Sequence, residues 1–224
     1  NIVGVGGPGV TPPNVGWREE ASGWASASPL GSGTYLYRFL PKSKRSVDDY
    51  PSMNLAVRKK DFLEVGGYDS NYWPGEDTKL CLDLVVKTNK KIIYDPKVLV
   101  YHHRRPILVP HLRQNGSFGL HRGFFARILP ATSLRPIYFL PSAMLLAFLF
   151  FPLIYYYQIS FLINFTQISF LLYFFALLGN AIWIYLASKK SSQAFLSMPT
   201  IFITHLWYGL RFLQGLLFTD KLIQ

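Results

Sequence analysis

The feature that most constrains this chain is a stretch from Pro136 to Ser188 that contains no charged residue. One membrane-spanning helix needs roughly 20 apolar residues, so the stretch is long enough for two. Polar residues at 164–167 divide it, and we expect spans at about 137–157 and 168–187 with the turn between them. A large hydrophobic core without a membrane is the alternative, and the length and aromatic content of the stretch disfavour it.

A third apolar segment, at about 195–218, contains His205 and Arg211. Ionisable side chains are costly in lipid, so they indicate either a polar cavity or a position at the membrane interface. The sequence therefore predicts two to three transmembrane helices and leaves the role of the third segment open.

Basic residues flank the uncharged stretch. Arg127 and Arg135 precede it, and Lys189 and Lys190 follow it. Because positive charges accumulate on the cytoplasmic side of membrane proteins, we expect the residues before the first span to lie in the cytoplasm. The sequence thus predicts a multi-pass protein of the cell (inner) membrane with a cytoplasmic soluble domain.

The net charge is +11, and no acidic residue occurs between Asp95 and Asp220. A basic region beside apolar segments suits an anionic membrane face or a phosphorylated substrate. Nucleic acid is disfavoured as a partner, because no recognised nucleic-acid motif accompanies the charge. The single Cys81 excludes an intrachain disulfide and a multi-cysteine metal site, and its place on the apolar side of an expected helix indicates a buried thiol.

The first part of the chain has the pattern of a soluble α/β domain, a sheet covered by helices. Apolar periodicity and turn residues predict strands at 52–58, 91–94 and 98–102 and helices at 60–65 and 77–88. Residues 8–34 are rich in Gly, Pro and Ser and are expected to form a long loop.

Residues 109–128 interleave aromatic and basic side chains, which is typical of a helix lying in the membrane interface. Gly116, Gly119 and Gly123 weaken the helix prediction, and they would allow a backbone to approach a ligand closely. We therefore divide the chain into a soluble domain (1–106), an amphipathic interfacial segment (107–135) and a transmembrane region (136–224).

Glu76 and Asp77 follow Gly75 at the expected start of a helix. Acidic residues are favoured there in any protein, because they accept hydrogen bonds from free N–H groups and interact with the helix dipole. The functional alternative is that one carboxylate takes a proton from an attacking hydroxyl, which accelerates a reaction by about 10²–10⁴-fold.

The run His102, His103, Arg104, Arg105 ends the last expected strand. Neighbouring side chains on a strand point to opposite faces, so at most one His and one Arg are expected in the same pocket. His102 could ligate a divalent ion, and Arg104 or Arg105 could bind a diphosphate through bidentate hydrogen bonds. A solvated basic cluster beside the membrane is the alternative.

Gln114, His121 and Arg122 form a third group of candidates. They could line a groove where a phosphate leaving group meets the bilayer. The alternative is an interfacial helix whose polar face only contacts lipid headgroups.

Five short motifs occur in a fixed order, namely 54–58 (NLAVR), 62–69 (FLEVGGYD), 75–78 (GEDT), 93–96 (IYDP) and 100–102 (VYH). In this order they resemble the C-terminal half of family-2 glycosyltransferases. The block from Gln114 to Gly123 and the apolar tail are similar to membrane-bound, exopolysaccharide-type members, such as those of succinoglycan synthesis.

The resemblance implies a glycosyltransferase-A (Rossmann-like) fold. It also implies inverting transfer of a sugar from a nucleotide-diphosphate donor to a lipid-linked or polysaccharide acceptor at the cytoplasmic membrane face. By this resemblance Asp77 is the base that deprotonates the acceptor hydroxyl, with Glu76 beside it. His102 corresponds to a histidine that reaches the metal or the diphosphate, and Gln114 and Arg122 to a segment near the diphosphate and acceptor.

The family's N-terminal half binds the nucleotide and carries an Asp-x-Asp metal motif, which does not occur in this sequence. Asp48 and Asp49 are discounted, because no strand is expected before them. We therefore expect a partial domain that lacks the N-terminal half and is inactive alone, with Mg²⁺ or Mn²⁺ held mainly by that half. The departure from a Gln-x-x-Arg-Trp motif disfavours processive polymerisation.

A rival hypothesis from another class is a non-catalytic, membrane-anchored basic module that binds anionic lipid or a partner synthase. The acid-free stretch between Asp95 and Asp220 motivates this hypothesis.

Overall fold

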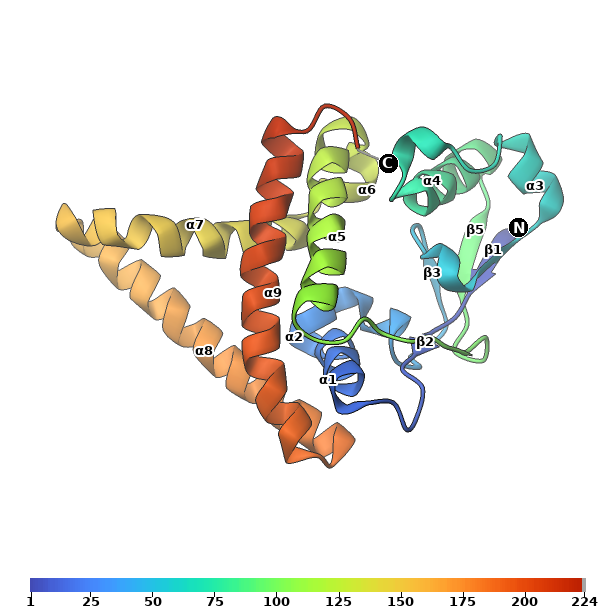
Figure 1. Ribbon diagram of the computed structural model, residues 1–224. Coiled ribbons are helices and arrows are strands. Elements are labelled where there is room, and N and C mark those ends of the chain that lie inside the picture. Colours follow the sequence, from blue (N-terminus) through green and yellow to red (C-terminus); the bar gives the residue numbers. More distant parts are fainter. Residues whose placement is uncertain (223–224) are drawn as a thin grey trace. The chain divides into compact units, whose positions relative to one another are not determined.

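The computed structural model describes residues 1–222, which divide into two compact units (Figure 1). The α/β unit contains residues 1–15, 34–103 and 219–222, and the helical unit contains 16–33 and 104–218. The mixed α/β architecture expected from the sequence is confirmed at this level. Each unit is described by itself.

The α/β unit is built on a four-stranded sheet in the order β3-β5-β1-β4. The strands are β1 (Ile2–Gly6), β3 (Arg45–Val47), β4 (Leu55–Val57) and β5 (Lys91–Tyr94). β1 pairs parallel with β5, with Val5 opposite Ile93, and both edge strands are antiparallel to their neighbours. A separate parallel pair joins β2 (Gly9–Val10) to β6 (Val100–Tyr101).

The core of this unit lies where the apolar face of α4 (Glu76–Thr88) packs against the sheet. Leu80, Cys81 and Leu84 are buried there with Val3 and Ile92. The buried thiol predicted for Cys81 is confirmed. Burial of such apolar side chains is the main favourable contribution to folding.

The short elements around this core follow local sequence signals. Helix α3 (Lys59–Glu64) is followed by Gly66 and Gly67, whose φ angles of 93° and 71° are easily reached only by glycine. The remaining elements are the 3₁₀ turns η1 (Gly33–Arg38), η2 (Ser52–Asn54) and η3 (Ser70–Tyr72).

The expected strand 52–58 is shorter than predicted, because η2 occupies its first three residues. The side-chain amide of Asn54 donates to the carbonyl oxygens of Gly7, at 2.6 Å, and Val98, at 2.7 Å. This side chain therefore ties the turn to two other segments of the α/β unit before β4 begins.

The long loop expected at 8–34 is wrong in its second half, which forms α1 (Trp17–Ser26) and α2 (Pro29–Ser32) of the helical unit. Small residues on α1, such as Ala21 and Ala25, are buried. Ser28 caps α2 by accepting a hydrogen bond from the N–H of Gly31 at 3.2 Å. Ser22 and Gly23, which are of the residue types that suggested a loop, are buried on α1 together with these alanines.

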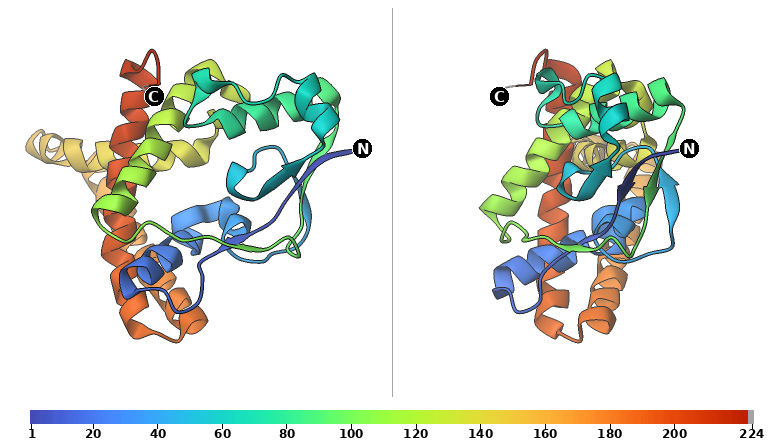
Figure 2. Two further views of the ribbon diagram at one scale, coloured as in Figure 1. Left: turned by 45° about the vertical axis from the view of Figure 1, so that its right-hand side comes forward. Right: turned by 90° about the vertical axis from the view of Figure 1, so that its right-hand side faces the viewer.

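The other helices of the helical unit are α5 (Val109–Ile128), α6 (Pro130–Ser133), α7 (Pro136–Tyr156), α8 (Ser160–Ser188) and α9 (Ser191–Phe218). Figures 1 and 2 show α5 running alongside α9, whereas α7 crosses α9. A Cβ on Gly119 or Gly123 would meet the backbone of Tyr208 or Phe212. The glycines that weakened the helix prediction therefore bring α5 against α9, not against a ligand.

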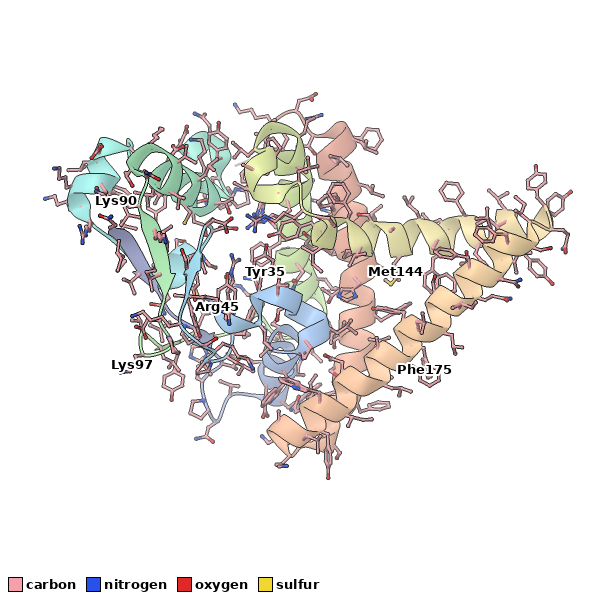
Figure 3. All side chains as sticks on the ribbon, turned by 180° about the vertical axis from the view of Figure 1, so that it is seen from behind. Tyr35, Arg45, Lys90, Lys97, Met144 and Phe175 are labelled. Carbon is pink, nitrogen blue, oxygen red and sulfur yellow. The ribbon has the colours of Figure 1, made fainter. Side chains whose placement is uncertain are left out.

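Helices α7 and α8 are long and apolar enough to cross a membrane. In the most apolar part of each helix, only 6% of α7 and 22% of α8 is buried. The core helix of a soluble protein, in contrast, is mostly buried. Figure 3 shows side chains projecting from both helices along their lengths, with Met144 labelled on α7 and Phe175 on α8. Among the described residues, α9 is not one of the helices that are both long and apolar enough to cross a membrane.

The turn between α7 and α8 lies at residues 157–159, and the prediction of a turn at 164–167 is wrong. Gln158 reverses the chain with a φ of 52°. Asn164 and Gln167 lie within α8, where the helix satisfies their backbone groups. Isolated polar side chains are thus compatible with a continuous helix.

Candidate active site

Asp77 lies in the first turn of α4, directly after Glu76. Its Oδ1 accepts a hydrogen bond from the N–H of Thr78 at 2.7 Å, and its Oδ2 accepts one from the N–H of Ser52 at 3.1 Å. The carboxylate is therefore held by backbone groups from α4 and from η2. The bond from Thr78 is what a residue at a helix start makes to a free N–H group. The second bond, from Ser52, also fixes the direction of the Asp77 carboxylate.

The pKa of the Asp77 carboxyl is raised above its ordinary value. Burial is the largest cause, and the negative charges of Asp49 and Glu76 act in the same direction. The hydrogen bonds from Ser52 and Thr78 oppose the shift by stabilising the ionised form. A carboxylate with a raised pKa is a better proton acceptor than an ordinary surface aspartate, which suits a general base.

Glu76 is half-buried, and its Oε2 is buried without a hydrogen-bond partner among the described residues. A buried carboxylate oxygen without a partner is costly, so such an atom is a candidate contact for a ligand or a water molecule. Glu76 therefore adds an acceptor beside Asp77 at the start of α4.

Asp49, which was discounted in the sequence, is only 3% exposed and lies close to this helix start. Its Oδ1 accepts a hydrogen bond from the hydroxyl of Thr78 at 3.2 Å. Its Oδ2 lies 3.5 Å from Nη2 of Arg38, and the same nitrogen donates to the Asp49 carbonyl oxygen at 2.7 Å. The pair Arg38–Asp49 is thus part of the surroundings of Asp77, although the sequence led us to discount Asp49 and gave no indication of Arg38.

Tyrosine rings surround the Arg38 side chain. Its guanidinium carbon lies 4.5 Å from the ring centre of Tyr35 and 5.8 Å from that of Tyr50, distances typical of cation–π contacts. Figure 3 labels Tyr35 and Arg45 of this region. The hydroxyl of Tyr50 donates to the carbonyl oxygen of Gly7 at 2.8 Å, which fixes one wall of the cluster. Several tyrosines at 35–50 were the signal that could have indicated it.

His102 follows β6 in the α/β unit, and its N–H donates to the carbonyl oxygen of Val10 at 2.8 Å. Within residues 1–222, no group of three or more His, Cys, Asp or Glu side chains is placed to hold a metal ion. These residues therefore do not form a complete metal site by themselves, and a metal-binding role for His102 stays a prediction.

Arg104 and Arg105 belong to the helical unit. The N–H of Arg104 donates to Oε1 of Glu19 on α1 at 3.0 Å. Burial lowers the pKa of the Arg104 guanidinium to about 10, and the charge of Glu19 opposes this shift. Arg105 is exposed. Of the two, Arg105 is the more accessible to an external diphosphate.

The candidates on α5 are mostly packed within the helical unit. Gln114 is half-buried. The ring of His121 lies 5.9 Å from that of Phe118 and 5.5 Å from that of Phe125, and Arg122 is only 8% exposed. Nη1 of Arg122 donates to Oγ of Ser133 at 3.3 Å. These contacts explain burial of His121 and Arg122 by helix packing, and binding of substrate by them stays a prediction.

The candidate residues are divided between the two units. Asp77, Glu76 and His102 belong to the α/β unit, whereas the arginines and the α5 residues belong to the helical unit. That they converge on one substrate therefore stays a prediction. The compact group that the structure brings together consists of Asp77, Glu76, Thr78, Asp49 and Arg38.

Comparisons with models of protein families, with curated proteins and with solved structures found no match to this chain. A functional proposal therefore depends on the residues, the geometry and the motif resemblance described above.

Proposed function

We propose that this chain is part of an inverting glycosyltransferase of family-2 type that is anchored in the cell membrane. It would move a sugar from a nucleotide-diphosphate donor to a lipid-linked or polysaccharide acceptor at the cytoplasmic face. The observation that carries this proposal is the Asp77 carboxylate, which backbone N–H groups of Ser52 and Thr78 hold in one direction and whose pKa is raised.

In the proposed reaction, Asp77 accepts the proton of an acceptor hydroxyl while the hydroxyl oxygen attacks the anomeric carbon of the donor sugar. A bond from oxygen to that carbon forms, and the bond from the carbon to the diphosphate breaks. The nucleoside diphosphate leaves with the electron pair, and attack from the opposite side inverts the anomeric centre. Removing the proton as the bond forms avoids a positively charged oxygen and lowers the barrier.

The resemblance implies a divalent cation that neutralises the departing diphosphate. Because the described residues do not form a complete site for one, no step above is assigned to it. The proposal places its main ligands in residues that are not part of this sequence.

Membrane anchoring by α7 and α8 suits an acceptor carried on a lipid, because it keeps the enzyme at the depth of the acceptor headgroup. The rival hypothesis of a basic lipid-binding module needs accessible cations. Arg104 is half-buried beside Glu19, and Arg122 is packed against Ser133, so two of the expected cations are poorly placed for binding anionic lipid.

Replacing Asp77 by Asn in the full-length protein tests the proposal. Membranes that contain the protein are screened with nucleotide sugars, and release of the nucleoside diphosphate is measured. We expect Asp77→Asn to reduce turnover at least about 100-fold while donor binding is retained, because only proton transfer is lost.

Asp83→Asn is the matched control, because Asp83 lies on the same helix and pairs with Lys79 and Lys87. Its turnover should stay close to that of the unmodified protein. Near-normal turnover of Asp77→Asn would remove Asp77 from the mechanism, and absence of turnover with every donor would favour the non-catalytic module.

A further inference from the structure

A stripe of exposed apolar side chains follows one face of α9. The stripe residues recur three, four or seven to eight positions apart, the spacing of one helix face, and they are Phe195, Ile203, Trp207, Leu210 and Leu217. Between 39% and 73% of each side chain is exposed. An exposed apolar stripe along one helix face is typical of a surface that contacts a membrane or another protein.

The other faces of α9 are occupied within the helical unit. Gly215 of α9 lies against Leu120 of α5. Ile201 packs with Leu177 of α8 in a buried cluster. Trp207, at the edge of the stripe, also lies against α5, and the remaining stripe residues are open to what surrounds the protein.

The direction of α9 differs from that of α7. Figures 1 and 2 show α7 running across α9, whereas α5 runs along it. The hydroxyl of Ser142 on α7 donates to the carbonyl oxygen of Gly209 at 3.0 Å, near the crossing point. If α7 crosses the bilayer steeply, α9 must run closer to the membrane plane.

The polar residues of α9 suit this orientation. Nη1 of Arg211 donates to Oε1 of Gln214 at 2.5 Å, and its guanidinium carbon lies 6.0 Å from the ring centre of Trp207. A charged residue is costly in the hydrocarbon core, whereas Trp and Arg are favoured at the interface. In an interfacial helix, both residues can lie at the level of the lipid headgroups.

The residues after α9 supply an independent argument. Residues 219–222 belong to the α/β unit, and Leu222 is only 3% exposed. The α/β unit and these residues must therefore lie on the same side of a membrane. Two crossings satisfy this requirement, and three crossings would place residues 219–222 on the opposite side.

We infer that α9 is an interfacial helix that lays its stripe, Phe195 to Leu217, on a phospholipid bilayer, and that the chain crosses the membrane twice. This replaces the third span considered for 195–218. The inference rests on the proposed crossing of the membrane by α7 and α8, and it does not depend on glycosyl transfer.

Labelling of single cysteines in sealed vesicles of known orientation tests the number of crossings. The probe is a membrane-impermeant maleimide, and the added cysteines are Ser43→Cys in the α/β unit, Gln158→Cys between α7 and α8, and Asp220→Cys after α9. The unmodified protein supplies the background, because Cys81 is buried. We expect Ser43→Cys and Asp220→Cys to react from one side and Gln158→Cys from the other.

Reaction of Asp220→Cys from the same side as Gln158→Cys would show three crossings and overturn the inference. Reaction of all three from one side would show that α7 and α8 do not cross, and the basis of the inference would fail. Neither result depends on whether the protein transfers sugars.

Depth measurements test the orientation of α9 in proteoliposomes. An environment-sensitive fluorophore on Ile203→Cys, Leu210→Cys or Leu217→Cys is quenched by nitroxides placed at shallow or deep positions of the lipid chain. An interfacial helix predicts that shallow nitroxides quench all three labels best. In a spanning helix, the interval from 203 to 217 would cover about 20 Å of depth, so the labels would differ strongly.

Phe175→Cys is the deep control, because Phe175 of α8 is 58% exposed in the middle of a candidate span. It should be quenched best by the deep nitroxide. Preference for the deep nitroxide at Ile203→Cys or Leu210→Cys would contradict an interfacial α9.

Discussion

The hydroxyl of Thr78 donates a hydrogen bond of 3.2 Å to Oδ1 of Asp49. The backbone N–H of the same threonine donates to Asp77, so one residue connects the candidate base to a second, buried carboxylate. Arg38 lies on the other oxygen of Asp49 and partly balances its charge. The proton affinity of Asp77 therefore depends on its burial and, next to that, on Asp49, which is distant in the sequence.

Replacing Asp49 by Asn should lower the pKa of Asp77, because a negative charge that raises it is removed. A base must be ionised to act, so the acid limb of the pH–rate profile should move to lower pH. The measurement is nucleoside diphosphate release across the acid limb of the profile. Asp83→Asn, whose carboxylate pairs with two lysines on α4, should leave the acid limb unchanged. A shift to higher pH in Asp49→Asn would contradict the assignment.

Replacing Arg38 by Gln should destabilise the α/β unit by about 3 kcal/mol, because it leaves the carboxylate of Asp49 buried without its cation. The measurement is the free energy of unfolding of the detergent-solubilised protein. Adding Asp49→Asn to the Arg38→Gln variant should restore much of the lost free energy of unfolding, because no buried charge then remains unpaired. Arg45→Gln is the control at an exposed arginine and should change stability by no more than about 0.5 kcal/mol. Equal losses of stability in Arg38→Gln and Arg45→Gln would show that Arg38 and Asp49 do not form a buried ion pair.

Local elements of the α/β unit could be predicted from the sequence, and non-local contacts could not. The apolar spacing of Leu80, Cys81 and Leu84 predicted α4 to within one residue, and β5 lies at the expected positions. Both signals depend only on residues close in the sequence. The pair Arg38–Asp49 depends on how η1 and the residues after β3 are brought together, which no periodicity records.

Helix α1 shows the same limit. Ala25 of α1 packs against Leu177 and Ile201, which are distant in the chain. Because the buried side chains of α1 are small, they form no apolar period that would predict the helix. The glycines of α5 were likewise ambiguous, because their partner is α9. The apolar length of α7 and α8 was evident, but the position of their turn was not, since Asn164 is tolerated inside a helix.

Close packing of α5 on α9 predicts opposite effects of alanine at two glycines. At Gly123 a Cβ would collide with the carbonyl oxygen of Phe212, and overpacking of this kind costs about 1–3 kcal/mol. At Gly179 of α8 no atom lies within 4 Å of the added Cβ, and alanine should stabilise the helix by about 0.5–1 kcal/mol. Thermal unfolding in detergent compares the two variants. Similar stability of both would show that α5 and α9 are not in close contact.

His111 predicts how the stability of the helical unit depends on pH. Its Nδ1 lies 2.8 Å from Oγ of Ser22 on α1, and its Nε2 lies 3.0 Å from Oγ1 of Thr204 on α9. The ring is only 4% exposed, and burial lowers its pKa to about 4. The neutral ring therefore joins three helices, and protonation opposes this arrangement.

The sign of the effect follows from where each state binds the proton. An unfolded histidine is protonated below about pH 6.5, whereas the folded one remains neutral down to a pH of about 4. Stability from this residue is complete above pH 6.5 and is lost as the pH falls towards 4, by about 3 kcal/mol in total. Unfolding in detergent at several pH values measures this loss. His111→Gln should flatten the difference between neutral pH and a pH of about 4 relative to the unmodified protein, whereas His103→Gln, at an exposed position, should not. An unchanged pH dependence in His111→Gln would show that another group is responsible.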